Sequence, residues 1–401
     1  MRQINWGVIG PGSIARAFAY SIQGTTNSKL TSVFGRNHQK TDSFASKFHL
    51  NAHHRLSDFI SSKEIDAIYI ATPHSEHFFY ALEAIKNGKH VLCEKPLTMN
   101  AYESMVLIDL ANSKNIFLME AFMYRAHPQT RNILENLSFL SNSKEKILIE
   151  ASFGFTADVS KVHRLRNPDL GGGAILDVGC YPLTMTKLIA GHLQGLSFAE
   201  PKSISATGQI DETGVDLQSH AHIVFNDYIE AKISCAINED FSNNLVISSG
   251  KYSISVSDPW HCGQFKEGNS SIHLLNEGVI SQEIKCIDNE GLFTREIEHA
   301  SSCILEQKVE SDLISHADTQ SNMFWLDMWR QEMKINCPRS MIKNSPILQS
   351  QAYLFQDTQL KSTDLTGLNK SGSRLALGCD NQISDLHAYT CLLYTSPSPR
   401  D

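Results

Sequence analysis

Residues 7–15 read Gly7-Val8-Ile9-Gly10-Pro11-Gly12-Ser13-Ile14-Ala15, with the spacing G-x-G-x-x-A at the end of a short apolar run. This pattern is typical of a strand that turns tightly into a helix and binds a dinucleotide at the turn, although a purely structural turn is the alternative. Gly10 permits the turn, Gly12 lets the backbone approach a pyrophosphate, and Ala15 keeps the helix close to the sheet. The amides at the helix start favour phosphate. The expected cofactor loop is therefore Gly10, Pro11, Gly12, Ser13, Ile14 and Ala15.

Outward from this loop, short apolar runs alternate with longer amphipathic segments up to about residue 120. This alternation predicts an α/β fold of the Rossmann type, a doubly wound parallel sheet. The expected strands cover 4–10, 30–34, 67–72, 90–93 and 116–119. The expected helices cover 13–23, 38–48, 76–87 and 100–114, with Asn100 as a cap of the last one.

After about residue 145 the pattern changes to successive strands, expected at 146–155, 202–210, 219–225, 228–236 and 245–256. An apolar helix is expected at about 173–190, and a last helix with Trp325 and Trp329 before Pro338. These elements predict an α+β domain with an open, mainly antiparallel sheet. The expected divisions are 1–121 for the Rossmann domain, 122–338 for the catalytic domain, 339–390 for a linker with a possible second enzyme domain, and 391–401 for a non-native tail.

Composition narrows the class of protein. The 401 residues carry a formal net charge of −8, which disfavours a nucleic-acid partner. We find no apolar run of about 18 residues and no signal-peptide pattern, so neither a membrane span nor export is expected. The nine cysteines are scattered without a C-x-x-C pair, which fits reduced thiols in a cytoplasmic protein.

The second strand indicates which cofactor is bound. An NAD site usually has an acidic residue about 20 residues after the glycines. Here the strand is followed by Arg36 and Asn37, with Lys40 one turn later. An arginine pairs with the 2′-phosphate of NADP, where a carboxylate would repel it. NADP is therefore favoured and NAD remains possible, and an exposed loop arginine is the structural alternative.

Two further segments follow strands at the same edge of the predicted sheet. Thr72 and Pro73 are expected beside the nicotinamide ribose, with His74 and His77 as capping or phosphate-side residues. These histidines lack a clear third ligand, so no metal site is expected. In the second segment, Glu94-Lys95-Pro96, a lysine follows a buried strand; an ammonium placed there usually has a partner or a task, although a surface ion pair is the alternative.

A further motif in the second predicted domain reads Gly171-Gly-Gly173-x-x-x-Asp177-x-Gly-x-Tyr181. Together with the motifs above, it resembles the pattern of the Gfo/Idh/MocA oxidoreductase family. The resemblance covers about residues 3–338. It implies that Lys95 is catalytic or orients the substrate, that Glu94 and Lys95 border the cofactor, and that the second sheet pairs with another subunit, most simply in a dimer.

Many family members have histidine at the position of Tyr181. A tyrosine at this position resembles the branch of dimeric dihydrodiol dehydrogenases and NADP-dependent D-xylose dehydrogenases. Tyrosine has a pKa near 10, and a lysine ammonium nearby would lower it. Tyr181 is then expected to exchange the substrate proton. Asp177 would share its helix face, although Pro182 interrupts helical hydrogen bonding. A buried aromatic residue is the alternative. Arg125 and Arg164 are candidate substrate contacts.

Three functions follow from this resemblance. The first is an NADP-dependent oxidoreductase acting on the CH–OH group of a sugar or cyclic diol, with Tyr181 assisted by Lys95. The second uses NAD and an inositol or modified sugar, and the third is a non-catalytic dinucleotide sensor. Residues 374–378 faintly resemble the first strand of an aldo/keto reductase, which suggests a fused second enzyme.

Overall fold

The computed structural model describes residues 2–264, 269–288 and 290–335. The predicted linker, the possible second enzyme domain and the predicted non-native tail lie outside the described residues, as do the end of the second predicted domain and Pro338.

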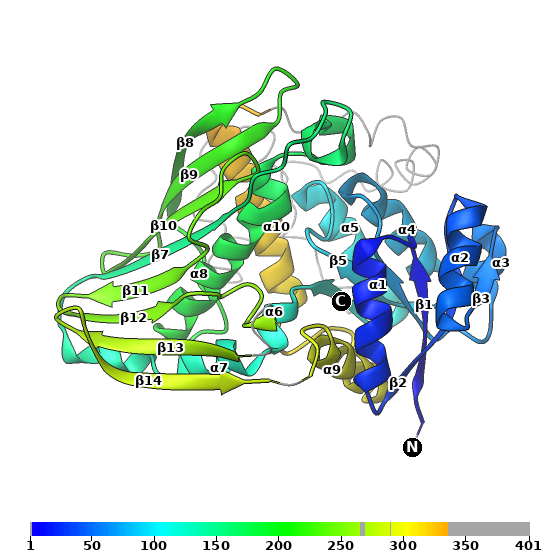
Figure 1. Ribbon diagram of the computed structural model, residues 1–401, viewed down its shortest axis with the longest axis horizontal. Coiled ribbons are helices and arrows are strands. Elements are labelled where there is room, and N and C mark those ends of the chain that lie inside the picture. The colour runs from blue at the N-terminus through cyan, green and yellow to red at the C-terminus, as the bar shows by residue number, and fades with distance from the viewer. Residues whose placement is uncertain (1, 265–268, 289, 336–401) are drawn as a thin grey trace, which may run out of the picture. The chain divides into compact units, whose positions relative to one another are not determined.

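The first sheet has six parallel strands in the order β3-β2-β1-β4-β5-β6. Its strands are β1 (Ile4–Ile9), β2 (Ser28–Phe34), β3 (Asn51–His53), β4 (Ala67–Ile70), β5 (His90–Glu94) and β6 (Leu118–Ala121). The helices are α1 (Ser13–Ser21), α2 (His38–Phe48), α3 (Leu56–Ser61), α4 (His74–Lys86) and α5 (Ala101–Lys114). The predicted Rossmann fold is confirmed (Figure 1).

The second sheet has eight strands in the order β14-β13-β12-β11-β7-β10-β9-β8. Only β7 and β10 pair in parallel, so the predicted mainly antiparallel sheet is confirmed. Its strands are β7 (Ile147–Gly154), β8 (Ser203–Ile210), β9 (Asp216–Val224), β10 (Ile229–Ala236), β11 (Leu245–Ser249), β12 (Tyr252–Val256), β13 (Asn269–Asn276) and β14 (Val279–Ile287). The single run expected at 245–256 is thus the hairpin of β11 and β12.

One face of this sheet is covered by two helices, α8 (Cys180–His192) and α10 (His316–Glu332) (Figure 1). Inward residues of the strands, such as Ile149, Ala231 and Ile233, are buried against them. Trp329 on α10 is fully buried, and its indole N–H donates to Ser219 Oγ at 2.8 Å. The helix with Trp325 and Trp329 is therefore part of the core.

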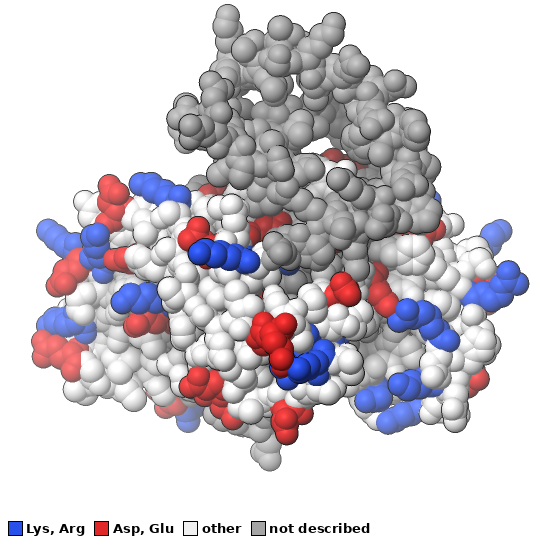
Figure 2. Space-filling model, turned by 90° about the horizontal axis from the view of Figure 1, so that it is seen from above, with Lys and Arg blue, Asp and Glu red and all other residues white. Residues whose placement is uncertain are grey.

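The opposite face of the second sheet is polar. The side chains of Glu150, Ser152, Lys232 and Ser234 alternate with the buried positions of β7 and β10, as a half-covered sheet requires. They line an open groove of about 600 Å³. In the view of Figure 2, basic and acidic side chains are interspersed over the described surface. Among the described residues, no helix is long and apolar enough to cross a membrane.

After the second sheet, the chain returns to the Rossmann domain through α9 (Thr294–Leu305). The indole N–H of Trp6, in β1, donates to Ser301 Oγ at 2.9 Å. The side-chain amide of Asn27 donates to the carbonyl of Glu298 at 2.9 Å. These bonds attach α9 to the edge of the first sheet where β1 and β2 begin.

Candidate active site

The candidate site forms where β5 ends, around the side chain of Lys95. Its Nζ atom donates to the backbone carbonyl of Asp177 at 2.6 Å and lies 4.0 Å from the Asp177 carboxylate. It also lies 5.1 Å from the ring centre of Tyr181. The structure therefore brings together the three residues that the sequence proposed as catalytic, although Lys95 is more than 80 positions away from Asp177 and Tyr181 in the chain.

Asp177 lies in a π-helical turn, Ile175–Gly179, which leads directly into α8. Pro182 is the third residue of α8, and because the π-helical turn runs into α8 without a break, the missing amide hydrogen removes one helical hydrogen bond at this junction. The glycines before the turn are needed for space: a Cβ atom on Gly173, with φ +111°, would lie 2.3 Å from Asp216 Oδ1. Asp216 in turn accepts from the amide of Ile175 at 2.6 Å. Asp216 thus holds the start of the turn that carries Asp177.

Three basic side chains surround one oxygen of Asp177. Arg164 Nη1 donates to Oδ1 at 2.8 Å, His74 Nε2 lies 3.7 Å away, and Lys95 lies at the 4.0 Å given above. Burial alone would raise the pKa of Asp177, but Lys95, Arg164 and His74 together lower it to about 2. Asp177 is therefore a buried carboxylate that holds Lys95 and Arg164 in place.

His74 and His77 bridge backbone segments. His74 Nδ1 lies 2.8 Å from the carbonyl of Gly171, and His77 contacts the carbonyls of Pro96 at 2.8 Å and Thr72 at 3.0 Å. Burial lowers the pKa of His74 to about 3 and that of His77 to about 4, so both rings are neutral at physiological pH. Within residues 2–264, 269–288 and 290–335, no three potential metal-ligating side chains lie together.

Tyr181 lies in an aromatic pocket. Its ring packs edge to face against Phe122 and Phe153, with centroid distances of 5.5 and 5.1 Å, and its hydroxyl lies 3.7 Å from Met123 Sδ. Burial raises the pKa of Tyr181 well above its usual value. The expected lowering of this pKa by Lys95 is not found, because the ammonium lies over the face of the ring and the apolar surroundings disfavour phenolate.

Glu94 faces the interior. Its Oε1 atom accepts from the Tyr69 hydroxyl, and burial raises the pKa of the carboxyl group. Arg125 is also directed into the core: its guanidinium donates to Asp318 at 2.9 Å and to the carbonyl of Leu313. Both residues were expected at the site surface, but the structure gives them internal partners. Arg164, in contrast, is 45% exposed and still contacts Asp177.

The glycine loop has the geometry that a dinucleotide requires. Gly10 has φ +92°, and a Cβ atom there would lie 2.8 Å from the carbonyl oxygen of Ala71. Gly12 precedes the first turn of α1, and a Cβ atom at Gly12 would meet no described atom within 4 Å. Thr72 Oγ1, beside the loop, is buried without a hydrogen-bond partner among the described residues. The loop therefore fits a pyrophosphate approaching the amides of α1.

At the end of β2 the structure adds a residue that the sequence did not indicate. Arg36 Nη2 lies 2.5 Å from Glu76 Oε1, in the first turn of α4. Asn37 is the cap of α2 and accepts from the amide of Lys40 at 2.9 Å. The sequence has no acid directly after the second strand, and Glu76 lies 40 positions beyond Arg36 in the chain.

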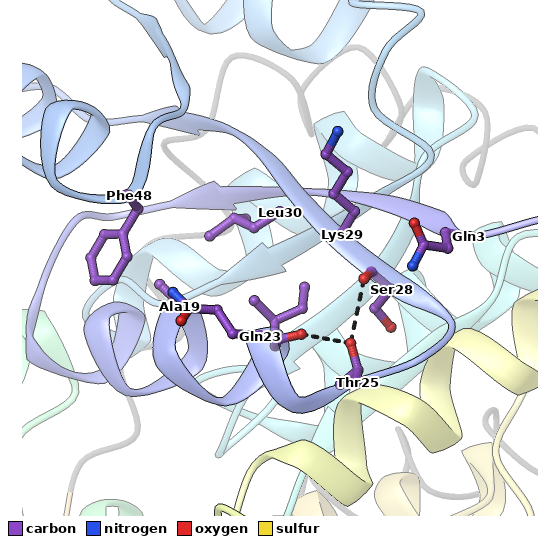
Figure 3. A pocket seen from close by; sticks show the side chains of 9 residues that line it. Gln3, Ala19, Gln23, Thr25, Ser28, Lys29, Leu30 and Phe48 are labelled. Atoms are coloured by element: carbon purple, nitrogen blue, oxygen red, sulfur yellow. Dashed lines mark hydrogen bonds between the residues drawn. The ribbon is translucent and has the colours of Figure 1, made fainter.

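A separate cavity of about 290 Å³ lies at the opposite edge of the Rossmann sheet (Figure 3). Gln3, Ser28 and Lys29 line it at the amino ends of β1 and β2, together with Phe48 and residues of α1. The glycine loop and Lys95 follow the carboxyl ends of their strands. This cavity therefore belongs to a different part of the domain from the candidate site.

Comparison with known proteins gives a consistent result. The sequence model of the oxidoreductase family with an NAD-binding Rossmann fold, Gfo/Idh/MocA, matches residues 4–122. The chain is 29% identical over 337 residues to trans-1,2-dihydrobenzene-1,2-diol dehydrogenase of Xenopus tropicalis, covering 83% of this chain and 99% of the relative. It is also 29% identical over 233 residues to an NADP-dependent D-xylose 1-dehydrogenase of Hypocrea jecorina, covering 53% and 60% of the two chains.

Solved structures show the same fold. A 3-ketoreductase from Actinomadura kijaniata, crystallised with TDP-benzene and NADP, superimposes with a TM-score of 0.71 at 20% identity, covering 82% of this chain and 98% of the other. An aldose-aldose oxidoreductase from Caulobacter crescentus gives 0.71 at 19% identity, covering 83% and 98%. The family model confirms the resemblance that the motifs indicated over residues 4–122, and the solved structures confirm the fold.

Proposed function

We propose that this chain, whose residues 4–122 match the model of the Gfo/Idh/MocA oxidoreductase family with an NAD-binding Rossmann fold, is an NADP-dependent dehydrogenase or reductase acting on a sugar or a cyclic diol. One observation carries this proposal: Lys95, Asp177 and Tyr181 meet beside the carboxyl end of β5. In a parallel sheet that edge also holds the dinucleotide loop. A substrate hydroxyl or carbonyl group in this place lies within reach of both the cofactor and a proton donor.

The preference for NADP rests on Arg36. Its side chain is 71% exposed at the carboxyl end of β2, next to the glycine loop, where the adenine ribose of a dinucleotide lies in this fold. A guanidinium there can pair with a 2′-phosphate through two hydrogen bonds. The D-xylose dehydrogenase relative is named as an NADP-dependent enzyme.

The cofactor, when bound, exchanges a hydride with the substrate carbon, and the chain's own residues handle the proton. Tyr181 is protonated at neutral pH because burial raises its pKa, so in reduction it donates its hydroxyl proton to the carbonyl oxygen. The C=O bond becomes C–O–H, and the tyrosine recovers a proton from solvent. In oxidation it must accept the alcohol proton, which its surroundings favour only at higher pH or beside a positive charge.

Lys95 orients and polarises the substrate oxygen. Its ammonium is fixed by the Asp177 carbonyl and lies near the Asp177 carboxylate, so two of the surrounding groups stabilise its charge. Arg164 shares that carboxylate and is half-exposed, which makes it a suitable contact for a second hydroxyl of a polyol. Asp177 is a positioning residue that keeps both cations at the site.

The experiment is a spectrophotometric assay of the full chain with NADPH or NADP and a panel of aldoses, ketoses and trans-diols. We expect turnover that Tyr181→Phe reduces by about 10²- to 10⁴-fold, the usual contribution of a positioned acid or base. Tyr124→Phe is the matched control, because Tyr124 is another buried tyrosine of the same aromatic pocket, with a ring centroid 5.8 Å from that of Tyr181. Unchanged turnover in Tyr181→Phe would remove the proposed role, and tight NADPH binding without turnover of any substrate would favour a non-catalytic dinucleotide sensor.

We further propose a homodimer that pairs through the polar face of the second sheet, as the family resemblance implies. The face offers alternating donors, acceptors and charges of both signs, including Glu150, Lys232 and the pair of His222 and Glu230 at 2.7 Å. Light scattering after gel filtration should give twice the chain mass. A double change of Lys232→Glu and Ser234→Arg should give the monomer mass.

A cytoplasmic location is the remaining proposal. Among the described residues, Cys93, Cys180, Cys235, Cys262, Cys286 and Cys303 are buried free thiols. Such thiols persist in a reducing compartment, whereas secreted domains of modest size are commonly cross-linked. Immunofluorescence with the full chain in its own cells tests this, and a secreted product would contradict it.

A further inference from the structure

The ion pair between Arg36 and Glu76 joins two neighbouring strand-to-helix connections of the Rossmann domain. Arg36 follows β2, and Glu76 lies in the first turn of α4, which begins just after β4. The backbone before Arg36 packs closely against the glycine loop, because a Cβ atom on Gly35 would lie 2.6 Å from Pro11 and 2.7 Å from Thr41. The guanidinium therefore starts beside the glycine loop and has the Glu76 carboxylate against it.

We propose that Glu76 is a specificity-determining residue that opposes Arg36, so that the site binds the 2′-phosphorylated dinucleotide only moderately better than the unphosphorylated one. This proposal rests on the proposed function in one respect, namely that the loop of residues 10–15 binds a nicotinamide dinucleotide. It makes the choice between NADP and NAD a balance between two opposed charges rather than the property of Arg36 alone.

The physical basis is competition and repulsion. A 2′-phosphate that pairs with Arg36 must share or displace the guanidinium that Glu76 already contacts at 2.5 Å. A phosphate held on the same guanidinium lies within a few ångströms of the carboxylate, and like charges at such separations repel appreciably when solvent screening is incomplete. The Glu76 side chain is only 18% exposed, so its screening is incomplete.

An unphosphorylated ribose carries no charge that the Glu76 carboxylate would repel. Its 2′-hydroxyl is a neutral donor that a carboxylate can accept, which is the usual role of an acidic residue in NAD sites. Glu76 reaches this position from α4, whereas in the sequence pattern of NAD sites the acid comes from the end of the second strand. The contact with Arg36 holds the carboxylate at the end of β2, and Tyr80 nearby packs on Phe34 of that strand with ring centroids 6.2 Å apart.

The test is binding of NADPH and of NADH to the full chain, each followed by nicotinamide fluorescence without substrate. We expect Glu76→Gln to tighten NADPH binding by about tenfold and to change NADH binding by less than about threefold, as removal of one like charge near a phosphate predicts. The gain for NADPH should shrink as the salt concentration rises, because salt screens the repulsion. Glu83→Gln is the matched control: Glu83 is also an α4 glutamate paired with a base, Lys86 at 3.3 Å, but lies at the far end of the helix.

The outcomes separate the two proposals. If wild type binds neither dinucleotide, the proposed function fails, and this inference fails with it. If wild type binds both and Glu76→Gln leaves the ratio of the two dissociation constants within twofold, only the role of Glu76 is overturned. Glu76→Ala repeats the measurement with the hydrogen-bonding group removed as well. Arg36→Ala should weaken NADPH binding and leave NADH binding nearly unchanged, and equal losses for both would contradict the opposed-charge account.

Discussion

The Nζ atom of Lys95 donates a hydrogen bond to the backbone carbonyl of Asp177 at 2.6 Å, although the lysine follows a strand of the first sheet and the aspartate precedes a helix on the second. A backbone carbonyl does not titrate, so its ability to accept this hydrogen bond does not change with pH. The carboxylate of the same residue adds charge stabilisation from 4.0 Å. Asp177 therefore contacts Lys95 through both its main chain and its side chain.

The first prediction concerns this lysine. Lys95→Met should lower kcat/KM by about 10²- to 10³-fold, because the charge next to the reacting oxygen is lost. NADPH binding should change by less than about threefold. The control is Lys89→Met, because Lys89 bonds two backbone carbonyls, at 2.6 and 2.7 Å, at the other end of β5. Comparable loss of activity in both variants would mean that Lys95 acts only through stability.

The second prediction is a pH profile of the two directions of reaction. Because burial raises the pKa of Tyr181, the tyrosine stays protonated through neutral pH. The rate of carbonyl reduction should therefore be nearly flat from about pH 6 to 8, while alcohol oxidation should rise with pH. Stopped-flow single-turnover rates in each direction measure this. An oxidation rate that falls with pH over the same range would require a different proton acceptor.

The third prediction separates the two glycines of the loop. Gly12→Ala should leave the melting temperature unchanged, because a Cβ atom there meets no described atom within 4 Å, but should weaken NADPH binding at least about tenfold, since the methyl group occupies the path of the pyrophosphate. Gly10→Ala should destabilise the fold by about 1–3 kcal/mol, because φ is +92° and the Cβ atom would lie 2.8 Å from the Ala71 carbonyl oxygen. Thermal melting and fluorescence titration of both variants test this distinction. Equal changes in melting temperature and in NADPH affinity for the two variants would refute it.

The fourth prediction is a loss of stability in mild acid. His74 and His77 have folded pKa values of about 3 and 4, whereas unfolded histidine titrates near 6.5. The unfolded chain therefore binds more protons below pH 6.5, and stability that is present above this pH is lost as the pH falls toward 4. At pH 5 each histidine should account for about 2 kcal/mol of the loss.

Urea unfolding at pH 7 and pH 5 measures this effect. His77→Gln should be less stable than wild type at pH 7, because it loses contacts with Pro96 and Thr72, but should lose less stability on going to pH 5. The exposed His38→Gln serves as the control and should follow wild type at both pH values. An equal acid-dependent loss in His77→Gln and wild type would assign the effect to other groups.

Much of the fold could be predicted because caps and apolar spacing within short segments indicate its helices and strands. Helix α2 was expected at 38–48 and is found at His38–Phe48, since Asn37 is a good cap and the apolar positions recur with helical spacing. The elements not predicted are those whose stability comes from neighbours. Strand β3 has three largely exposed residues, and β14 exposes nearly all of its side chains, so neither shows a clear apolar alternation. Helices α3 and α9 were likewise not predicted.

The candidate site divides in the same way. Lys95, Asp177 and Tyr181 could be proposed from motifs, because the family resemblance implied that these residues share a site. The partners of Arg36, Arg125 and Glu94 could not, because each partner lies between 25 and about 190 positions away in sequence. The direction of the pKa shift of Tyr181 was also wrong, since burial by four aromatic neighbours, Phe122, Tyr124, Phe153 and Trp260, depends on the tertiary fold.

The π-helical turn at Ile175–Gly179 has a consequence for how the chain is made. All six strands of the first sheet precede this turn in the chain, so the glycine loop and Lys95 are synthesised before the segment that carries Asp177 and Tyr181. At that stage Lys95 has no carbonyl to hold it and no tyrosine beside it. The proposed proton-transfer site is therefore completed only when the later half of the chain has folded onto the earlier one.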